Sequence, residues 1–300
     1  MKINTSFIYF FIFIFLYIAS FFLKLDIAGG SFPDLKTHWT YIQKLSSVGL
    51  INIFDIETGE KSANGIDSKL LNFPLHHIIF SQIFFINKNL NAYLNLIFII
   101  SFLVPLLFYI CCAKRFVEIE KKKLLVFSSI IFILPNFQSS GIWGNNHNTA
   151  IIFFLISIFY LIKIENSTLK KNKDIFFTYL FLFLSMYTKQ YYVIFFPIVF
   201  LKIFLKYKFD VIFITLISCI ILSIPGIIFL YNNLGLFNNL IFTATNFSSS
   251  IIVVASIISF YLIPFLYVEI QNNKFYFKNL VSNKKFIIYF IIFFIFIIFA

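Results

Sequence analysis

Apolar runs about as long as a membrane-spanning helix recur along the whole chain, and this feature most constrains the fold. Of the 300 residues, 60% are hydrophobic and 22% are aromatic. A soluble globular protein could not bury so much apolar surface. Apolar runs of about 20 residues are instead typical of helices that cross a bilayer. We therefore predict an all-α fold, a polytopic transmembrane helical bundle.

The charged residues fit the same interpretation. The net charge is +12, but most lysines stand in short clusters between apolar runs, where they orient a membrane protein. We therefore expect no nucleic-acid partner. The three cysteines, Cys111, Cys112 and Cys219, lie in or beside apolar runs and have no disulfide or metal-binding spacing.

We expect a single transmembrane domain over residues 1–300 with about nine spans. The lysine-bearing start favours a cytoplasmic N-terminus. The last apolar run is cut off by the end of the chain, so we expect the C-terminus to be incomplete. The predicted spans are Phe7–Leu23, Ala92–Cys112, Leu124–Phe137, Thr149–Ile162, Ile175–Tyr187, Tyr191–Leu205, Val211–Leu230, Ile251–Ile270 and Phe286–Ala300.

The longest polar region, residues 24–90, follows the first span and is predicted to be an outer loop with interfacial helices. Residues 55–68, which include two glycines, are typical of an irregular loop. The apolar piece Phe73–Ile86 has about 14 residues, fewer than a span needs. Counting it as a span would also place the basic loop at residues 114–123 outside, against the charge rule. We therefore predict an interfacial or re-entrant juxtamembrane helix there.

Asp34 and His38 are the first candidate site residues. Pro33 favours a helix start, and a helix from Asp34 brings His38 one turn later onto the same face. Asp34 could be a general base, or simply a solvated acid at a helix N-terminus. The two side chains could bind a divalent cation, or His38 could contact a phosphate. Two ligands are too few to specify a metal site, and an ordinary surface histidine is the alternative.

Two further histidines, His76 and His77, stand in the predicted juxtamembrane helix. Neighbouring residues on a helix point in different directions, so we expect at most one of them to point into a site. Both could instead reach toward the membrane interface.

The segment SSGIWGNNHN, residues 139–148, is predicted to be an outer loop. Amide groups such as that of Asn146, the His147 imidazole and the Trp143 indole suit recognition of a sugar. The same residues also suit a plain interfacial turn with a tryptophan at the membrane boundary.

Lys189 and Gln190 stand between two apolar runs on the predicted outer side, where the charge rule disfavours lysine. A cation at such a helix junction could bind a phosphate or pyrophosphate. A lysine whose ammonium simply reaches water is the alternative reading.

Taken in order, five motifs resemble the GT-C superfamily of membrane glycosyltransferases, close to the protein mannosyltransferase and aminoarabinose transferase type. The similarity spans about residues 1–210. It lies in an acid-bearing outer loop, a juxtamembrane helix, a span with a basic inner end, a proline-ended span with its outer loop, and a Thr-Lys turn. These motifs read FPDLKTHW, FPLHHIIFSQIF, LLFYICCAKRF, LPNFQSSGIWGNNHN and YTKQYYVIFFP.

The resemblance implies an enzyme that transfers a hexosyl or pentosyl group, with inversion, from a polyprenyl-phosphate donor to a glycan, lipid or protein acceptor. Asp34 would be the catalytic base or help to hold a divalent cation, and Lys189 would contact the lipid phosphate. Family members often carry an acid near the start of the fourth span, where this chain has Asn146, His147 and Asn148. The resemblance places the protein in a bacterial inner membrane, with its site on the outer side.

Other classes of protein remain open at this point. An O-antigen polymerase-like protein also uses lipid-linked sugars on the outer face. A flippase-like polysaccharide transporter would have ionisable residues in the middle of its spans, and this chain has almost none there. An inactive paralogue is the third alternative.

Overall fold

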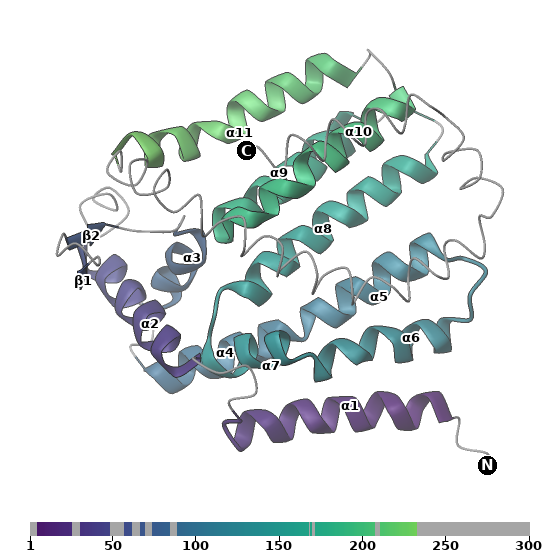
Figure 1. Cartoon of the computed structure of the whole chain (residues 1–300). Coiled ribbons are helices and arrows are strands. Elements are labelled where there is room, and N and C mark those ends of the chain that lie inside the picture. The colour runs from purple at the N-terminus through teal and green to yellow at the C-terminus, as the bar shows by residue number, and fades with distance from the viewer. Residues whose placement is uncertain are drawn as a thin grey trace, which may run out of the picture. The chain divides into compact units, whose positions relative to one another are not determined.

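The computed structural model describes residues 5–25, 31–48, 57–61, 67–69, 74–84, 89–167, 169, 172–207 and 211–232. Helices make up most of this part of the chain (Figure 1). The predicted spans at Ile251–Ile270 and Phe286–Ala300 lie outside it, so they stay predictions.

The first half of the chain has one long apolar helix followed by shorter elements. Two short strands pair antiparallel where we predicted an irregular loop, so that prediction missed a hairpin. The elements are α1 (Thr5–Phe22), α2 (Ser31–Val48), β1 (Glu57–Lys61), β2 (Asp67–Lys69), α3 (Leu75–Phe84), α4 (Leu90–Ser101) and α5 (Leu103–Arg115).

The second half is a series of helices joined by short turns. Two 3₁₀ segments, η2 and η3, continue into or out of α-helices. The elements are α6 (Lys121–Ser129), η2 (Ile130–Ile133), α7 (Pro135–Trp143), α8 (His147–Asn166), α9 (Asn172–Thr188), η3 (Gln190–Phe195), α10 (Phe196–Tyr207) and α11 (Ile212–Asn232).

Four helical segments of the described chain are long and apolar enough to cross a membrane: Leu90–Arg115, His147–Asn166, Gln190–Tyr207 and Ile212–Phe229. The bent pair formed by α6–η2 and α7 makes a fifth if it is counted as one span. The apolar segment of α1, Ser6–Phe22, is shorter, and α9 has 17 residues. These segments match an integral membrane protein.

The third predicted span, Leu124–Phe137, is wrong at its outer end. The helix stops at Ile133, and α7 leaves at an angle of 62°. Pro135 explains the break, because proline disfavours helical backbone at the preceding residue, and Leu134 is extended with ψ 126°. The first part of the predicted outer loop, residues 139–143, is therefore helical.

The long helices lie side by side in the order α1, α6, α5, α8, α9 and α11 (Figure 1). Helix α2 packs on α3 and on α7, and α3 also contacts α9. Helices α2 and α3 therefore lie near the start of α8 and beside α9. An apolar cluster that includes Leu35, Ile42, Phe80 and Ile97 joins α2, α3 and α4 there.

Candidate functional site

A pair of histidines joins α2 to α3. The Nδ1 atom of His38 lies 2.7 Å from the Nε2 atom of His77. Their rings are stacked, with centroids 4.9 Å apart. A hydrogen bond between two ring nitrogens needs one donor and one acceptor, so a single proton lies between the two imidazoles.

His76 has both ring nitrogens engaged within the protein. Its Nε2 lies 3.0 Å from the Tyr93 hydroxyl and its Nδ1 lies 3.0 Å from Thr149 Oγ1. The Tyr93 hydroxyl donates its only proton to the carbonyl of Gly144, at 2.5 Å. It must therefore accept from His76, whose proton is on Nε2, and Nδ1 accepts from Thr149. His76 ties α3 to the starts of α4 and α8.

Lys189 lies between α9 and η3 with an extended backbone, and its charge acts on the histidines. The pKa of His38 falls to about 3, chiefly because the ring is removed from water and further because of the Lys189 charge. Burial also lowers the pKa values of His76 and His77 well below their usual range, and nearby imidazoles and Lys189 add to the effect. All three imidazoles are therefore neutral at pH 7.

The start of α8 reaches the same turn. The hydroxyl of Tyr191 lies 2.6 Å from Nδ1 of His147, and the two rings are stacked. The Asn146 amide donates to the carbonyl of Thr188 at 3.1 Å. Asn146 thus contacts the residue before Lys189, and His147 contacts a residue shortly after it.

The charge of Lys189 therefore acts on all four histidines of the chain, so the five residues lie in one region of the structure. The histidines come from α2, α3 and the first residue of α8. We call His38, His76, His77, His147 and Lys189 the histidine cluster. The sequence singled out all five residues, but it gave no reason for Tyr93 or Thr149, which are ordinary residues of predicted spans.

The remaining candidates are placed less centrally. Trp143 packs against the apolar cluster of α2, α3 and α4, and Gln190 is exposed at the start of η3. Asp34 belongs to α2, one turn before His38, but its side chain lies outside the described part of the structure. The roles given to these residues therefore stay predictions.

Within the described residues, no group of three or more His, Cys, Asp or Glu side chains could hold a metal ion. His38 contributes its Nδ1 to His77 instead. A divalent cation on Asp34 and His38 also stays a prediction, because it depends on the Asp34 side chain.

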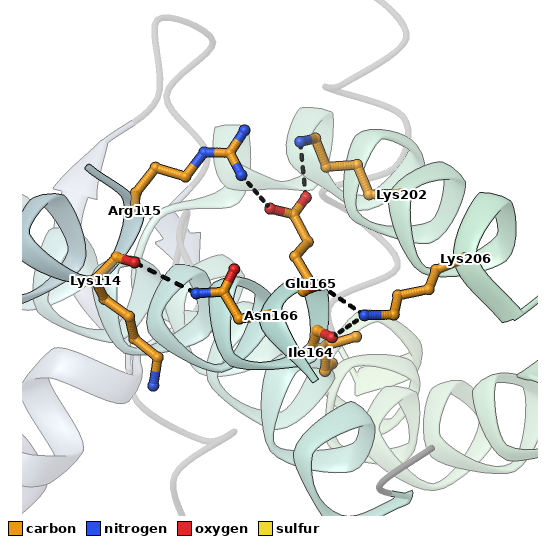
Figure 2. A network of polar contacts seen from close by, with 7 residues as sticks. All are labelled: Lys114, Arg115, Ile164, Glu165, Asn166, Lys202 and Lys206. Carbon is orange, nitrogen blue, oxygen red and sulfur yellow. Dashed lines mark hydrogen bonds and ion pairs between the residues drawn. The ribbon is translucent and has the colours of Figure 1, made fainter. Parts of the chain in front are cut away.

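Charged residues meet at the other end of α8. Glu165 lies between Arg115 and Lys202, at 3.3 and 2.8 Å, as Figure 2 shows. Lys163 pairs with Asp174 at the start of α9, at 2.7 Å. Since an α-helix rises about 1.5 Å per residue, Glu165 lies about 27 Å along α8 from the histidine cluster.

Comparison with known protein families, with curated proteins and with solved structures found no match to this chain.

Proposed function

We propose that this protein is an integral membrane glycosyltransferase that moves a sugar from a polyprenyl-phosphate donor to an acceptor hydroxyl. The observation that carries the proposal is the histidine cluster, which gathers neutral imidazoles around a lysine at one end of the long helices. Such a set of groups suits a bound phosphate, because the ammonium attracts the anion and the imidazoles donate or accept protons.

In the proposed reaction the polyprenyl phosphate leaves the sugar as an anion. Lys189 offsets the negative charge that grows on that phosphate in the transition state, and Gln190 adds a polar contact. Asp34 takes the proton of the acceptor hydroxyl. The hydroxyl oxygen attacks the anomeric carbon from the face opposite the leaving phosphate, which inverts the configuration at that carbon. The donor tail stays in the bilayer while its headgroup reaches the histidine cluster.

The rest of the proposal follows the resemblance. His147, Asn146 and Trp143 would contact the sugar, and a divalent cation could assist Asp34. The acceptor would be a glycan, a lipid or a protein, at the outer face of a bacterial inner membrane with a cytoplasmic N-terminus. The basic residues of the Glu165 end, such as Arg115 and Lys202, are those expected on the cytoplasmic side.

A transporter of lipid-linked sugars is less well supported. The charged residues within three of the candidate spans, such as Lys114, Glu165 and Lys206, lie toward one end of each helix. A transporter would have such groups near the middle of the membrane. Only a measurement of enzymatic activity distinguishes a transferase from an O-antigen polymerase-like protein or an inactive paralogue.

The test is cleavage of polyprenyl-phosphate sugars by membranes that contain the full chain, measured as release of polyprenyl phosphate. We expect Asp34→Asn to lower the rate at least 100-fold with normal expression, because the base is lost. Lys36→Gln, an exposed position on the same helix, is the matched control. Wild-type turnover in Asp34→Asn would remove Asp34 from the mechanism, and no turnover of any donor by the wild type would overturn the proposal.

A further inference from the structure

His77 has a buried ring nitrogen that none of the described residues contacts by a hydrogen bond. The side chain is 3% exposed, and its Nε2 is taken by His38. Its Nδ1 has no hydrogen-bond partner among the described residues. Leaving such an atom unpaired costs about 1–3 kcal/mol. Buried polar atoms in native proteins almost always have a partner, so this nitrogen indicates something that the site binds.

The surrounding residues fix the direction of this nitrogen. His76, the preceding residue, is held by Tyr93 and Thr149 at 3.0 Å each. That anchor sets the rotation of α3 about its axis, and the stack with His38 sets the ring plane of His77. His77 Nδ1 is therefore presented in one orientation before any ligand arrives, which lowers the cost of binding.

The charge of the surroundings decides the class of ligand. Lys189 is close enough to act on His38, His76 and His77, which are neutral. A cationic ligand would be repelled there, whereas an anionic oxygen would be attracted. In a neutral His77 whose Nε2 accepts from His38 Nδ1, the proton is on Nδ1, so His77 can donate to that oxygen.

We infer that His77 Nδ1 donates a hydrogen bond to a phosphate oxygen of the ligand that Lys189 attracts, and that His38 holds His77 in the donating tautomer. This inference rests on the proposed function for the choice of a prenyl phosphate as ligand. His76 is a positioning residue, since its ring nitrogens are occupied by the protein. The shared chemistry is a phosphate group, borne either by a lipid or by a free ion.

The test compares two substitutions that each keep one half of the imidazole. Asparagine places an N–H near the position of Nδ1, whereas glutamine reaches the position of Nε2 and can keep the contact with His38. Binding of radiolabelled farnesyl phosphate to the purified full-length protein is measured in nanodiscs. We expect His77→Gln to weaken binding at least 10-fold and His77→Asn to stay within about 3-fold of wild type.

The ligand arms separate the possible sources of the phosphate. Farnesol, which lacks phosphate, should bind equally to the wild type and to both variants. Competition by inorganic phosphate would show that the phosphate group suffices, and its failure to compete would show that the lipid ester is needed. If the two variants differ as expected, either result supports His77 as a hydrogen-bond donor to the phosphate.

Three results would overturn the inference: equal affinity of both variants and wild type, equal weakening of both variants, or farnesyl phosphate binding no better than farnesol. A second measurement needs no variant. Because the chain has four histidines, ¹⁵N-histidine labelling gives four pairs of ring signals. Saturation with farnesyl phosphate should shift one Nδ1 signal by several ppm, and no shift of any ring would also overturn the inference.

Failure of this inference is distinguishable from failure of the proposed function. Phosphate binding that depends on His77 without sugar transfer would overturn the transferase and leave the phosphate site standing. Sugar transfer with unchanged binding in His77→Gln would do the reverse.

Discussion

At the scale of single residues, the side chain of Lys206 caps the C-terminal end of α8. Its ammonium donates to the carbonyls of Ile164, Glu165 and Ser167 at 2.5, 2.7 and 2.5 Å. Figure 2 shows the contacts to Ile164 and Glu165. The last carbonyls of α8 have no partner within the helix, and the negative end of the helix dipole favours a cation there.

Lys206→Met should therefore destabilise the protein by about 1.5–3 kcal/mol, because carbonyls at the end of α8 lose a charged donor. Lys202→Met is the matched control, since Lys202 lies one turn earlier on α10 and makes a partly exposed ion pair with Glu165. Its loss should cost about 0–1 kcal/mol. Thermal unfolding in detergent micelles measures both, and equal shifts of Tm would contradict the capping role of Lys206.

The histidines also give the protein a pH-dependent stability. The folded-state pKa of His38, about 3, lies below the value near 6.5 that a histidine has in an unfolded chain. Below pH 6.5 the unfolded chain takes up a proton that folded His38 does not bind, so stability is lost as pH falls toward 3. The slope is up to about 1.4 kcal/mol per pH unit for one histidine.

We therefore expect Tm to fall between pH 7 and pH 4.5 and to fall less in His38→Asn, which keeps a polar group but no titrating ring. The difference between the two curves isolates His38 from the carboxylates, which titrate in both proteins. Parallel curves would show that His38 is not held neutral in the fold.

The candidate site shows what single residues reveal in a sequence. Lys189 stood out because a lysine on the predicted outer side breaks the charge rule. His76 and His77 stood out as polar groups within an apolar segment, whereas His38 and His147 stood out within polar loops between apolar runs. Tyr93 and Thr149 could not be found in this way. Their roles depend on partners far along the chain, and no local pattern marks a tyrosine that accepts from a histidine.

At the scale of elements, the predicted helices were mostly right in position, since long apolar runs bounded by charges define them. The bend before α7 was missed because Phe132 and Phe137 continue the apolar run across Pro135. Helix α11 also contains a proline, Pro225, but it continues through that residue. Its neighbour α9 explains part of the difference.

Tyr187 of α9 contacts the α11 backbone on both sides of this proline. Its hydroxyl donates to the carbonyl of Leu222 and accepts from the backbone N–H of Gly226, at 3.2 Å. A Cβ on Gly226 would lie 3.0 Å from the Tyr187 ring, so glycine allows this close approach. Proline weakens the helix here, and the hydroxyl adds hydrogen bonds from outside.

Tyr187→Phe should lower stability by about 1–2 kcal/mol, because two hydrogen bonds to the α11 backbone are lost. Tyr160→Phe is the control, since that ring lies on α8 and stacks with Phe177 and Phe181. Unfolding of both variants in micelles decides the matter. A Tyr187→Phe protein as stable as Tyr160→Phe would show that the hydroxyl adds nothing to α11.

At the scale of the whole molecule, the described helices have two chemically different ends. The histidine cluster lies at the start of α8 and the Glu165 ion pairs lie near its end, about 27 Å apart. This separation is close to the thickness of the bilayer core, about 30 Å. The alternation of basic and neutral loops predicts which helix ends face the same side of the membrane, and this stays a prediction. The order of neighbouring helices could not be predicted, because apolar residues cover nearly every face.

The positive-inside rule predicts that the Glu165 end faces the cytoplasm. Single cysteines test this in a background without native cysteines, with Asn89→Cys near the histidine cluster and Glu118→Cys at the basic end. Both positions are exposed. We expect an impermeant maleimide to label Asn89→Cys in intact cells and Glu118→Cys only after permeabilisation. The reverse pattern would place the proposed site in the cytoplasm.

The histidine cluster also sets an order of events during biosynthesis. His38 and His77 leave the ribosome early, but Lys189 follows His38 by about 150 residues, which takes roughly 8–30 s at usual rates of translation. During that interval α2 and α3 have been synthesised, but the α9–η3 junction that carries Lys189 has not. A nascent chain stalled before this junction therefore carries an incomplete histidine cluster, and insertase or chaperone contacts should concentrate on α2 and α3 until α9 has been synthesised.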